Sequence, residues 1–257
     1  MTVPGPASVG LFKGPAAYEA RTPWSPVRAV LATICIVAAS IVGAGLALGL
    51  NLDAPFGIPG RLQPANQDRA ALITLAVWQS IAIVLTLVAS ALFRGNPRDV
   101  LALRRPVGSL SIYATAIALM FAMQVGVSVV QYSLLPDDMF TDLRPFVQYI
   151  TGSDWLLALM VVGIGAPLSE ELLFRGFLLS ALARSRLGFW GAALVVSGLW
   201  TALHIGYSLA GVIEVFLIGI YFSWLLWRTG SLRVAIFCHA LYNSLVVLVL
   251  RHVPLPT

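Results

Sequence analysis

The chain has 257 residues, of which 59% are hydrophobic and only 11% are charged. A soluble globular domain carries about 25% charged residues, so this composition excludes an ordinary soluble protein and indicates one that lies in a lipid bilayer. The net charge of +5 does not indicate a nucleic-acid-binding protein, because the arginines cluster between apolar runs, where they bias membrane topology. Membrane lipids are therefore the first partners that we expect.

The apolar part of the chain begins after a stretch rich in proline and glycine, and we expect a flexible cytoplasmic tail over residues 1–27. Residues 28–251 predict a single transmembrane domain, because no long polar stretch separates the apolar runs. Several runs reach the roughly 20 residues that a helix needs to cross about 30 Å of hydrocarbon. In chain order, we predict membrane helices over residues 28–50, 70–93, 110–135, 155–183, 188–205, 210–227 and 232–250.

These segments predict an all-α, polytopic integral membrane bundle of about seven transmembrane helices. The fifth and sixth segments meet at "HIGYSLAG", residues 204–211, which is either a tight turn or a continuation of helix. The fourth segment is longer than a bilayer requires, so it is tilted or projects beyond the membrane.

The loops between the segments differ in charge. The loop over 135–145 is acidic, whereas the alternate loops are basic. Because positive charge is retained on the cytoplasmic side, we predict a multi-pass protein of the cell membrane with a cytoplasmic N-terminus and an external C-terminus. The basic residues on which this rests are Lys13, Arg21, Arg28, Arg94, Arg98, Arg104, Arg105, Arg184, Arg186, Arg228 and Arg233.

Polar side chains within the apolar segments are the informative residues, because a charged group at a helix centre costs about 2.5–3.5 kcal/mol to insert into the bilayer. The fourth segment carries three such groups in "SEELLFRG", residues 169–176. Counting the rise along each segment places most of the set in a shared layer near the middle of the membrane. The set consists of Glu170, Glu171, Arg175, His204, Glu214, His239 and Asn243.

Spacing predicts which of these groups cooperate. Glu171 and Arg175 are four residues apart, so they share a helix face and pair. Glu170 lies about 100° round the same helix and is left without a local partner. His239 and Asn243 are also four residues apart, so both can point at one cavity.

A glutamate, two histidines and an asparagine in one layer make a chemical set. A carboxylate with a histidine can hold and deprotonate water, and a second histidine with an asparagine amide can stabilise the oxyanion that forms when this water attacks a carbonyl. Alternatively, Glu170, His204 and His239 ligate Zn²⁺ and leave one position open for water. Either arrangement suits peptide hydrolysis.

Three motifs in this order resemble those of a known family. The run "SEELLFRG" matches the EExxxR signature of the CAAX-protease and bacteriocin-processing (CPBP, ABI or type II CAAX endopeptidase) family of intramembrane proteases. "WTALH", residues 200–204, resembles its second motif, an aromatic residue, three unspecified residues and a histidine. "RTGSLRVAIFCHALYNSLV", residues 228–246, resembles its third, HxxxN. The resemblance covers a protease-like core of about residues 94–250.

The resemblance implies a helical membrane fold with a conical cavity open toward the cytoplasm. By matching motif positions, it also implies that Glu170 and His204 activate water, while His239 and Asn243 stabilise the oxyanion. The family's better-understood members look like glutamate-dependent enzymes without a firmly held zinc. On this basis no cofactor is assigned to the chain, and a bound Zn²⁺ is the alternative.

The remaining motif positions are expected to support this chemistry. The resemblance makes Glu171 and Arg175 residues that orient the fourth helix. Trp200 stands where the family often has phenylalanine, a change that we expect to leave the chemistry intact. Glu214 lies outside the three motifs, and the sequence does not assign it a role.

The leading functional prediction is an intramembrane endopeptidase. Its expected substrate is a peptide or the C-terminal tail of a membrane-associated or prenylated-type protein. The alternatives are a catalytically silent membrane adaptor or a protein of the bacteriocin-immunity type. A proton-coupled transporter that uses the Glu and His residues as a relay is disfavoured by the ordered motifs and by the absence of a visible repeat.

Overall fold

The computed structural model describes residues 11–12, 14–49, 64–106 and 110–255, which form helices and connecting loops and no β-strand. The predicted all-α fold is therefore confirmed. The elements in chain order are α1 (Pro26–Gly49), α2 (Pro64–Leu92), α3 (Pro97–Val100), α4 (Ser111–Leu134), η1 (Pro136–Asp138), α5 (Arg144–Thr151), α6 (Trp155–Ala158), η2 (Leu159–Gly165), α7 (Ala166–Glu170), η3 (Glu171–Leu179), α8 (Ser180–Leu182), α9 (Gly188–Thr201), α10 (Leu209–Thr229) and α11 (Leu232–His252).

Among the described residues, six helices are long and apolar enough to cross a membrane. The fifth predicted span differs, because α9 has only 14 residues and extends about 21 Å, which is shorter than the hydrocarbon layer. The chain leaves the helix after Thr201 and turns at Gly206, whose φ is +97°. "HIGYSLAG" is thus a turn followed by the start of α10. The six helices are Pro26–Gly49, Gln67–Leu92, Ser111–Leu134, Trp155–Leu182, Leu209–Thr229 and Leu232–His252.

The long fourth segment, Trp155–Leu182, alternates between α-helical and wide π-helical turns. The π-helical parts are η2 and η3; such wide turns are frequent at functional sites. Glycine allows close approach here: a Cβ on Gly163 would lie 2.6 Å from the hydroxyl of Ser244. This close approach brings α11 against the fourth segment, just below its glutamates.

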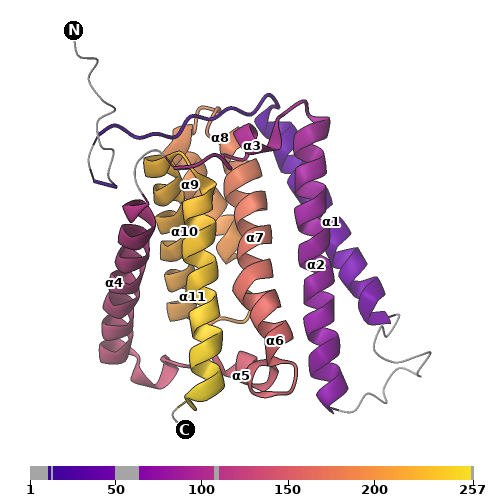
Figure 1. The fold of residues 1–257 in the computed structure, drawn as a ribbon, viewed down its shortest axis with the longest axis vertical. Coiled ribbons are helices and arrows are strands. Elements are labelled where there is room, and N and C mark those ends of the chain that lie inside the picture. The colour runs from indigo at the N-terminus through magenta and orange to yellow at the C-terminus, as the bar shows by residue number, and fades with distance from the viewer. Residues whose placement is uncertain (1–10, 13, 50–63, 107–109, 256–257) are drawn as a thin grey trace.

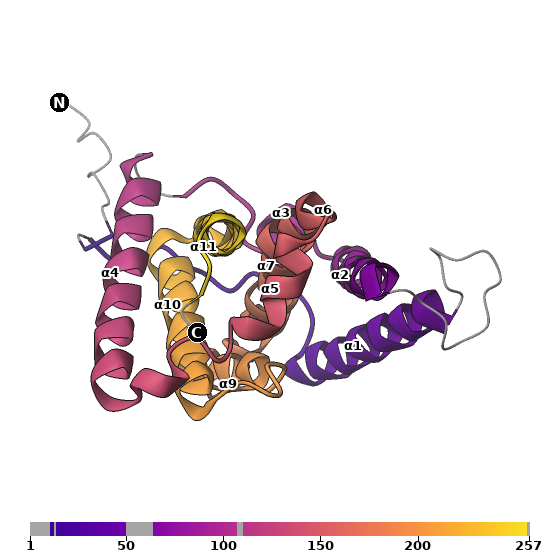
Figure 2. The same ribbon diagram turned by 90° about the horizontal axis from the view of Figure 1, so that it is seen from below.

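The helices form a central group flanked on two sides. In Figures 1 and 2, α10, α11 and the fourth segment lie together with α9, while α4 lies on one side and the α1–α2 pair on the other. Most of the buried hydrophobic residues form one continuous cluster that joins these elements. The ion pair of Glu171 and Arg175 therefore sits between packed helices, not on the lipid-facing surface.

The described part of the predicted tail is packed on the helix ends. Within residues 11–12 and 14–25, here called the N-terminal strap, Leu11 and Trp24 are buried. Arg228 at the end of α10 donates to the carbonyl oxygens of Leu11 at 2.6 Å and Gly14 at 3.0 Å. The hydroxyl of Thr22 donates to the carbonyl oxygen of Ser180 at 3.2 Å. This part of the segment is therefore not a free tail; residues 1–10 and 13 lie outside the described residues.

The strap closes one end of the bundle, and the basic loops gather there. This end also holds the α2–α4 connection, the α8–α9 turn and the α10–α11 turn, all at the top of Figure 1. The acidic connection over 135–145 and the C-terminus lie at the other end (Figure 1). The predicted alternation of loop charge thus corresponds to two distinct ends, here called the basic end and the acidic end.

Replacing Arg228 with alanine is expected to destabilise the protein by releasing the strap. The carbonyl oxygens of Leu11 and Gly14 would lose a charged donor, and we expect the free energy of unfolding to fall by about 1–3 kcal/mol. Thermal unfolding in detergent measures this change. Arg186→Ala, an exposed arginine at the same end, is the control and should shift stability by less than about 0.5 kcal/mol. Equal unfolding midpoints for the two variants would contradict a strap held by Arg228.

Candidate active site

A buried ion pair lies at the centre of the bundle. Nη1 of Arg175 is 3.1 Å from Oε1 of Glu171, and both side chains are fully buried. This is the pairing that the four-residue spacing predicts. Nδ1 of His239, on α11, lies 3.1 Å from the same carboxylate oxygen. Glu171 therefore ties the fourth segment to α11 and, through its charge, keeps Arg175 in place.

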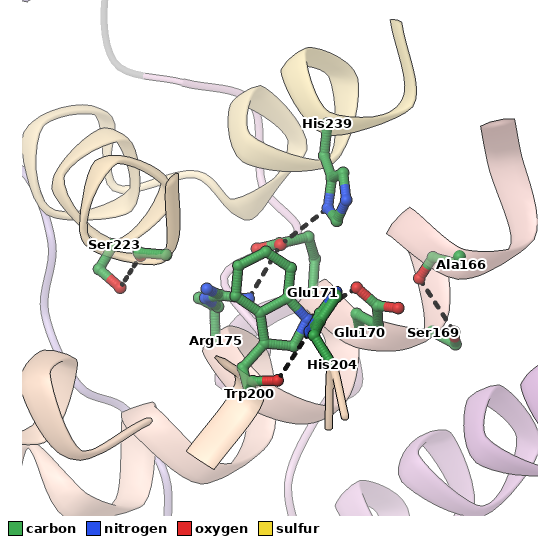
Figure 3. Close-up of polar contacts among 10 residues, drawn as sticks. Ala166, Ser169, Glu170, Glu171, Arg175, Trp200, His204, Ser223 and His239 are labelled. Carbon is green, nitrogen blue, oxygen red and sulfur yellow. Dashed lines mark hydrogen bonds and ion pairs between the residues drawn. The ribbon is translucent and has the colours of Figure 1, made fainter. Parts of the chain in front are cut away.

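Glu170 points away from this pair, toward α9. The indole Nε1–H of Trp200 donates to Oε2 of Glu170 at 2.7 Å (Figure 3). Glu170 is partly exposed, whereas Glu171 is completely buried. The two consecutive glutamates therefore have different environments: the second is neutralised by an arginine, and the first faces a cavity.

His204 sits just beyond the end of α9, where the chain turns. Its Nδ1 lies 3.1 Å from the carbonyl oxygen of Trp200, one helical turn back. A carbonyl oxygen only accepts hydrogen bonds, so Nδ1 carries the proton and Nε2 is the basic nitrogen of the neutral ring. The His204 ring also packs edge-on against the Trp200 ring, with centroids 5.1 Å apart.

A cavity of about 700 Å³ joins Glu170 and His204. Its walls are mostly aliphatic and come chiefly from the second half of α1 and the first half of α2. The lining residues are Val37, Ile41, Ala44, Leu48, Gln67, Ala70, Ala71, Leu72, Thr74, Leu75, Trp78, Phe146, Tyr149, Val162, Glu170, Leu203 and His204.

This cavity lies in the half of the bundle toward the acidic end. The contributing parts of α1 and α2, and α5 with them, are at the bottom of Figure 1, away from the strap. A cavity on the cytoplasmic side and cytoplasmic basic loops were both expected from the sequence. The two expectations cannot both hold, because the cavity and the basic loops lie toward opposite ends.

His239 and Asn243 line a different surface from the one expected. Both side chains face the fourth segment: His239 contacts Glu171, and the amide Nδ2 of Asn243 donates to the carbonyl oxygen of Val162 at 3.1 Å. The His239 ring also stacks on Phe222, with centroids 4.8 Å apart. Neither residue lines the cavity, so the structure brings His239 beside the ion pair and places Asn243 behind the cavity wall formed by Val162.

The zinc alternative does not fit this arrangement. Among the described residues, no three His, Cys, Asp or Glu side chains lie close enough together to hold a metal ion. The donor groups of the alternative set are directed to different partners: Glu170 to Trp200, His204 to a backbone carbonyl and His239 to Glu171. No step of the chemistry below is routed through a metal ion.

Glu214 belongs to a separate polar cluster that the sequence did not reveal. Its Oε1 accepts a hydrogen bond of 2.5 Å from Nε2 of Gln124, and the same nitrogen lies 2.6 Å from the hydroxyl of Tyr242. Arg228 and Arg233 lie at the basic end of the bundle and donate to backbone carbonyls. Glu214 thus holds α4 against α10 and α11, and it does not line the cavity. Glutamine and tyrosine are common enough in apolar segments that spacing gave no signal.

Replacing Arg175 with methionine is expected to leave Glu171 buried without its cation. Removing one partner of a buried ion pair costs about 3–5 kcal/mol, and we expect this loss in the free energy of unfolding, measured by chemical denaturation in detergent. Glu171→Gln combined with Arg175→Met is the control and should be less destabilised than Arg175→Met alone. If the double variant is less stable than Arg175→Met, then Arg175 is not what makes burial of the Glu171 charge tolerable.

Comparisons with known proteins match the part of the chain that carries the three motifs. The family model for "Type II CAAX prenyl endopeptidase Rce1-like" matches residues 152–245, the segment that carries all three motifs. An uncharacterized 24.3 kDa protein from Escherichia coli is 39% identical over 89 residues, which cover 34% of this chain and 41% of that protein. This chain therefore spans less than half the length of that relative. No solved structure matches the chain. The segment 152–245 is thus similar to the type II CAAX prenyl endopeptidase Rce1-like family.

Proposed function

We propose that this protein is an intramembrane endopeptidase in which Glu170 activates water to hydrolyse a peptide bond. The family match supports a CAAX-type intramembrane protease in general. The observation that carries the proposal is that Glu170 and His204 line one cavity inside a helical membrane bundle. A carboxylate and a basic imidazole nitrogen in a mostly aliphatic cavity can hold a water molecule against a bound substrate.

In the proposed reaction, Glu170 takes a proton from this water as the water oxygen attacks the carbonyl carbon of the scissile bond. The carbonyl becomes a tetrahedral oxyanion. When it collapses, the C–N bond breaks and the proton passes to the leaving amine, which restores Glu170. Nε2 of His204 helps to orient the water and to shuttle the proton, since Nδ1 is occupied by the carbonyl of Trp200.

His239 and Asn243 are proposed to stabilise the oxyanion. Neither side chain lines the cavity in the structure, so this role requires both to turn toward the bound substrate. Nε2 of His239 donates to the oxyanion in the imidazolium form, in which both ring nitrogens carry a proton, and Asn243 has a second amide hydrogen beyond its contact with Val162. Hydrogen-bond donors aimed at the developing negative charge lower the barrier of the reaction.

The substrate that suits this cavity is an apolar peptide segment or the tail of a membrane-associated protein. Aliphatic walls from α1 and α2 gain free energy by burying apolar side chains, at about 25 cal/mol per Å². A segment that fills the cavity also excludes bulk water from around the one water molecule that Glu170 holds, which strengthens the electrostatic effects at the scissile bond.

The function is tested by comparing cells that carry the wild-type protein with cells that carry Glu170→Gln at matched membrane levels. Mass spectrometry of new peptide termini in the membrane and secreted fractions should reveal termini that disappear in the variant. Glu214→Gln is the matched control, because it changes another glutamate within the membrane that does not line the cavity. Its profile should equal that of the wild type. Identical termini in all three samples would remove the protease proposal and favour the adaptor or immunity-type function.

We further propose that the basic end, with the N-terminal strap, faces the cytoplasm in the cell membrane, so that the cavity opens within the opposite half of the bilayer. This is tested with single cysteines in a Cys35→Ala background, since Cys238 is buried. A membrane-impermeant maleimide added to intact cells should label Thr141→Cys at the acidic end. It should label Leu187→Cys at the basic end only after permeabilisation. The opposite pattern would show the reverse orientation.

A further inference from the structure

Glu170 and Glu171 are adjacent in the sequence. In space, the side chain of Trp200 on α9 contacts both Glu170 and the arginine that pairs with Glu171. Arg175, the partner of Glu171, places Cζ of its guanidinium 4.3 Å from the centroid of the Trp200 ring. The indole N–H on the edge of the same ring donates to Glu170. The cation of the buried ion pair and the carboxylate at the cavity are thus joined by one aromatic side chain.

Trp200 is placed to be a strong and rigid donor. Its side chain is 2% exposed, so its hydrogen bond to a carboxylate is made at low local dielectric, where electrostatic attraction is strong. The guanidinium over the ring draws on its π electrons, which makes the N–H more acidic. The rings of His204, His239 and Phe222 surround the indole, with centroids 5.1, 5.7 and 6.4 Å from it, and fix its plane.

We propose that Trp200 is a positioning residue for the hydrolysis, in which its indole N–H fixes one oxygen of Glu170 so that the other is presented to water. This inference rests on the proposed function of Glu170. With Oε2 held at 2.7 Å, rotation of the carboxylate is restricted, and Oε1 keeps one direction relative to the cavity. A base held in one orientation needs no reorganisation before it takes a proton.

Trp200 is a position at which this chain differs from the family pattern. Phenylalanine, which often occupies this position in the family, keeps an aromatic face for the arginine but has no N–H donor. The sequence led us to expect that tryptophan here leaves the chemistry intact. The hydrogen bond to Glu170 gives this chain a contact that phenylalanine cannot make, so Trp200→Phe removes the donor and preserves most of the packing.

The hydrogen bond itself is tested without any substrate. The full chain is labelled with ¹⁵N at the indole nitrogens and placed in lipid nanodiscs, and the Trp200 resonance is identified by its loss in Trp200→Phe. A hydrogen-bonded indole proton resonates downfield, so the Trp200 signal should move upfield in Glu170→Leu, while the signal of Trp190 stays in place. A Trp200 signal that does not move would overturn the inference.

The positioning role is tested by kinetics on a fluorescence-quenched peptide that spans a cleavage site lost in Glu170→Gln cells. Trp200→Phe should lower kcat by about 10-fold or more, the effect of losing a hydrogen bond to a charged group, with KM changed less than about twofold. Trp190→Phe, the same substitution on the same helix at a partly exposed site, should retain wild-type kcat and KM. Thermal unfolding of each variant separates lost activity from lost folding.

The outcomes separate this inference from the proposed function. If Glu170→Gln cleaves the peptide as fast as the wild type, Glu170 is not the base and the proposed function itself fails. If Glu170→Gln is inactive while Trp200→Phe keeps wild-type kcat, only the positioning role is overturned. A Trp200→Phe variant that raises KM and leaves kcat unchanged also overturns it, because the residue would then act on substrate binding.

Discussion

The buried ion pair of Glu171 and Arg175 is the constraint on which the centre of this molecule depends. Two full charges inside a membrane bundle are tolerated only with close pairing and further hydrogen bonds. The surrounding helices contact both charges: His239 on α11 contacts the carboxylate, and the ring of Trp200 on α9 covers the guanidinium. Gly219 on α10 makes room as well, since a Cβ there would lie 3.0 Å from Nη2 of Arg175.

The two glutamates therefore have different surroundings. Glu171 is enclosed by Arg175 and His239 and helps to hold the central helices together. The other has one oxygen held by an indole and faces an aliphatic cavity. Most of that cavity's wall comes from α1 and α2, which lie outside the family match. The family segment thus supplies Glu170 and His204, and the first two helices supply most of the surface that a substrate would meet.

Much of this could be predicted from the sequence, and the failures have physical causes. Apolar runs of sufficient length identify helices, and the four-residue spacing identifies the pair Glu171 and Arg175, because both signals are local along one helix. The donor Trp200 and the cluster around Glu214 depend on contacts between helices, which local spacing does not encode. The length of α9 was overestimated because Leu203 and Ile205 continue the apolar run past the turn at Gly206.

The N-terminal strap has a consequence for biosynthesis. Its partners are made late: Arg228 follows Leu11 by 217 residues, and Ser180 follows Thr22 by 158. The strap is therefore synthesised before its partners and must wait, undocked, until α10 has been inserted. Contacts between residues so distant in sequence form late, because the intervening chain must first be ordered. Closure of the basic end is then a late step of assembly.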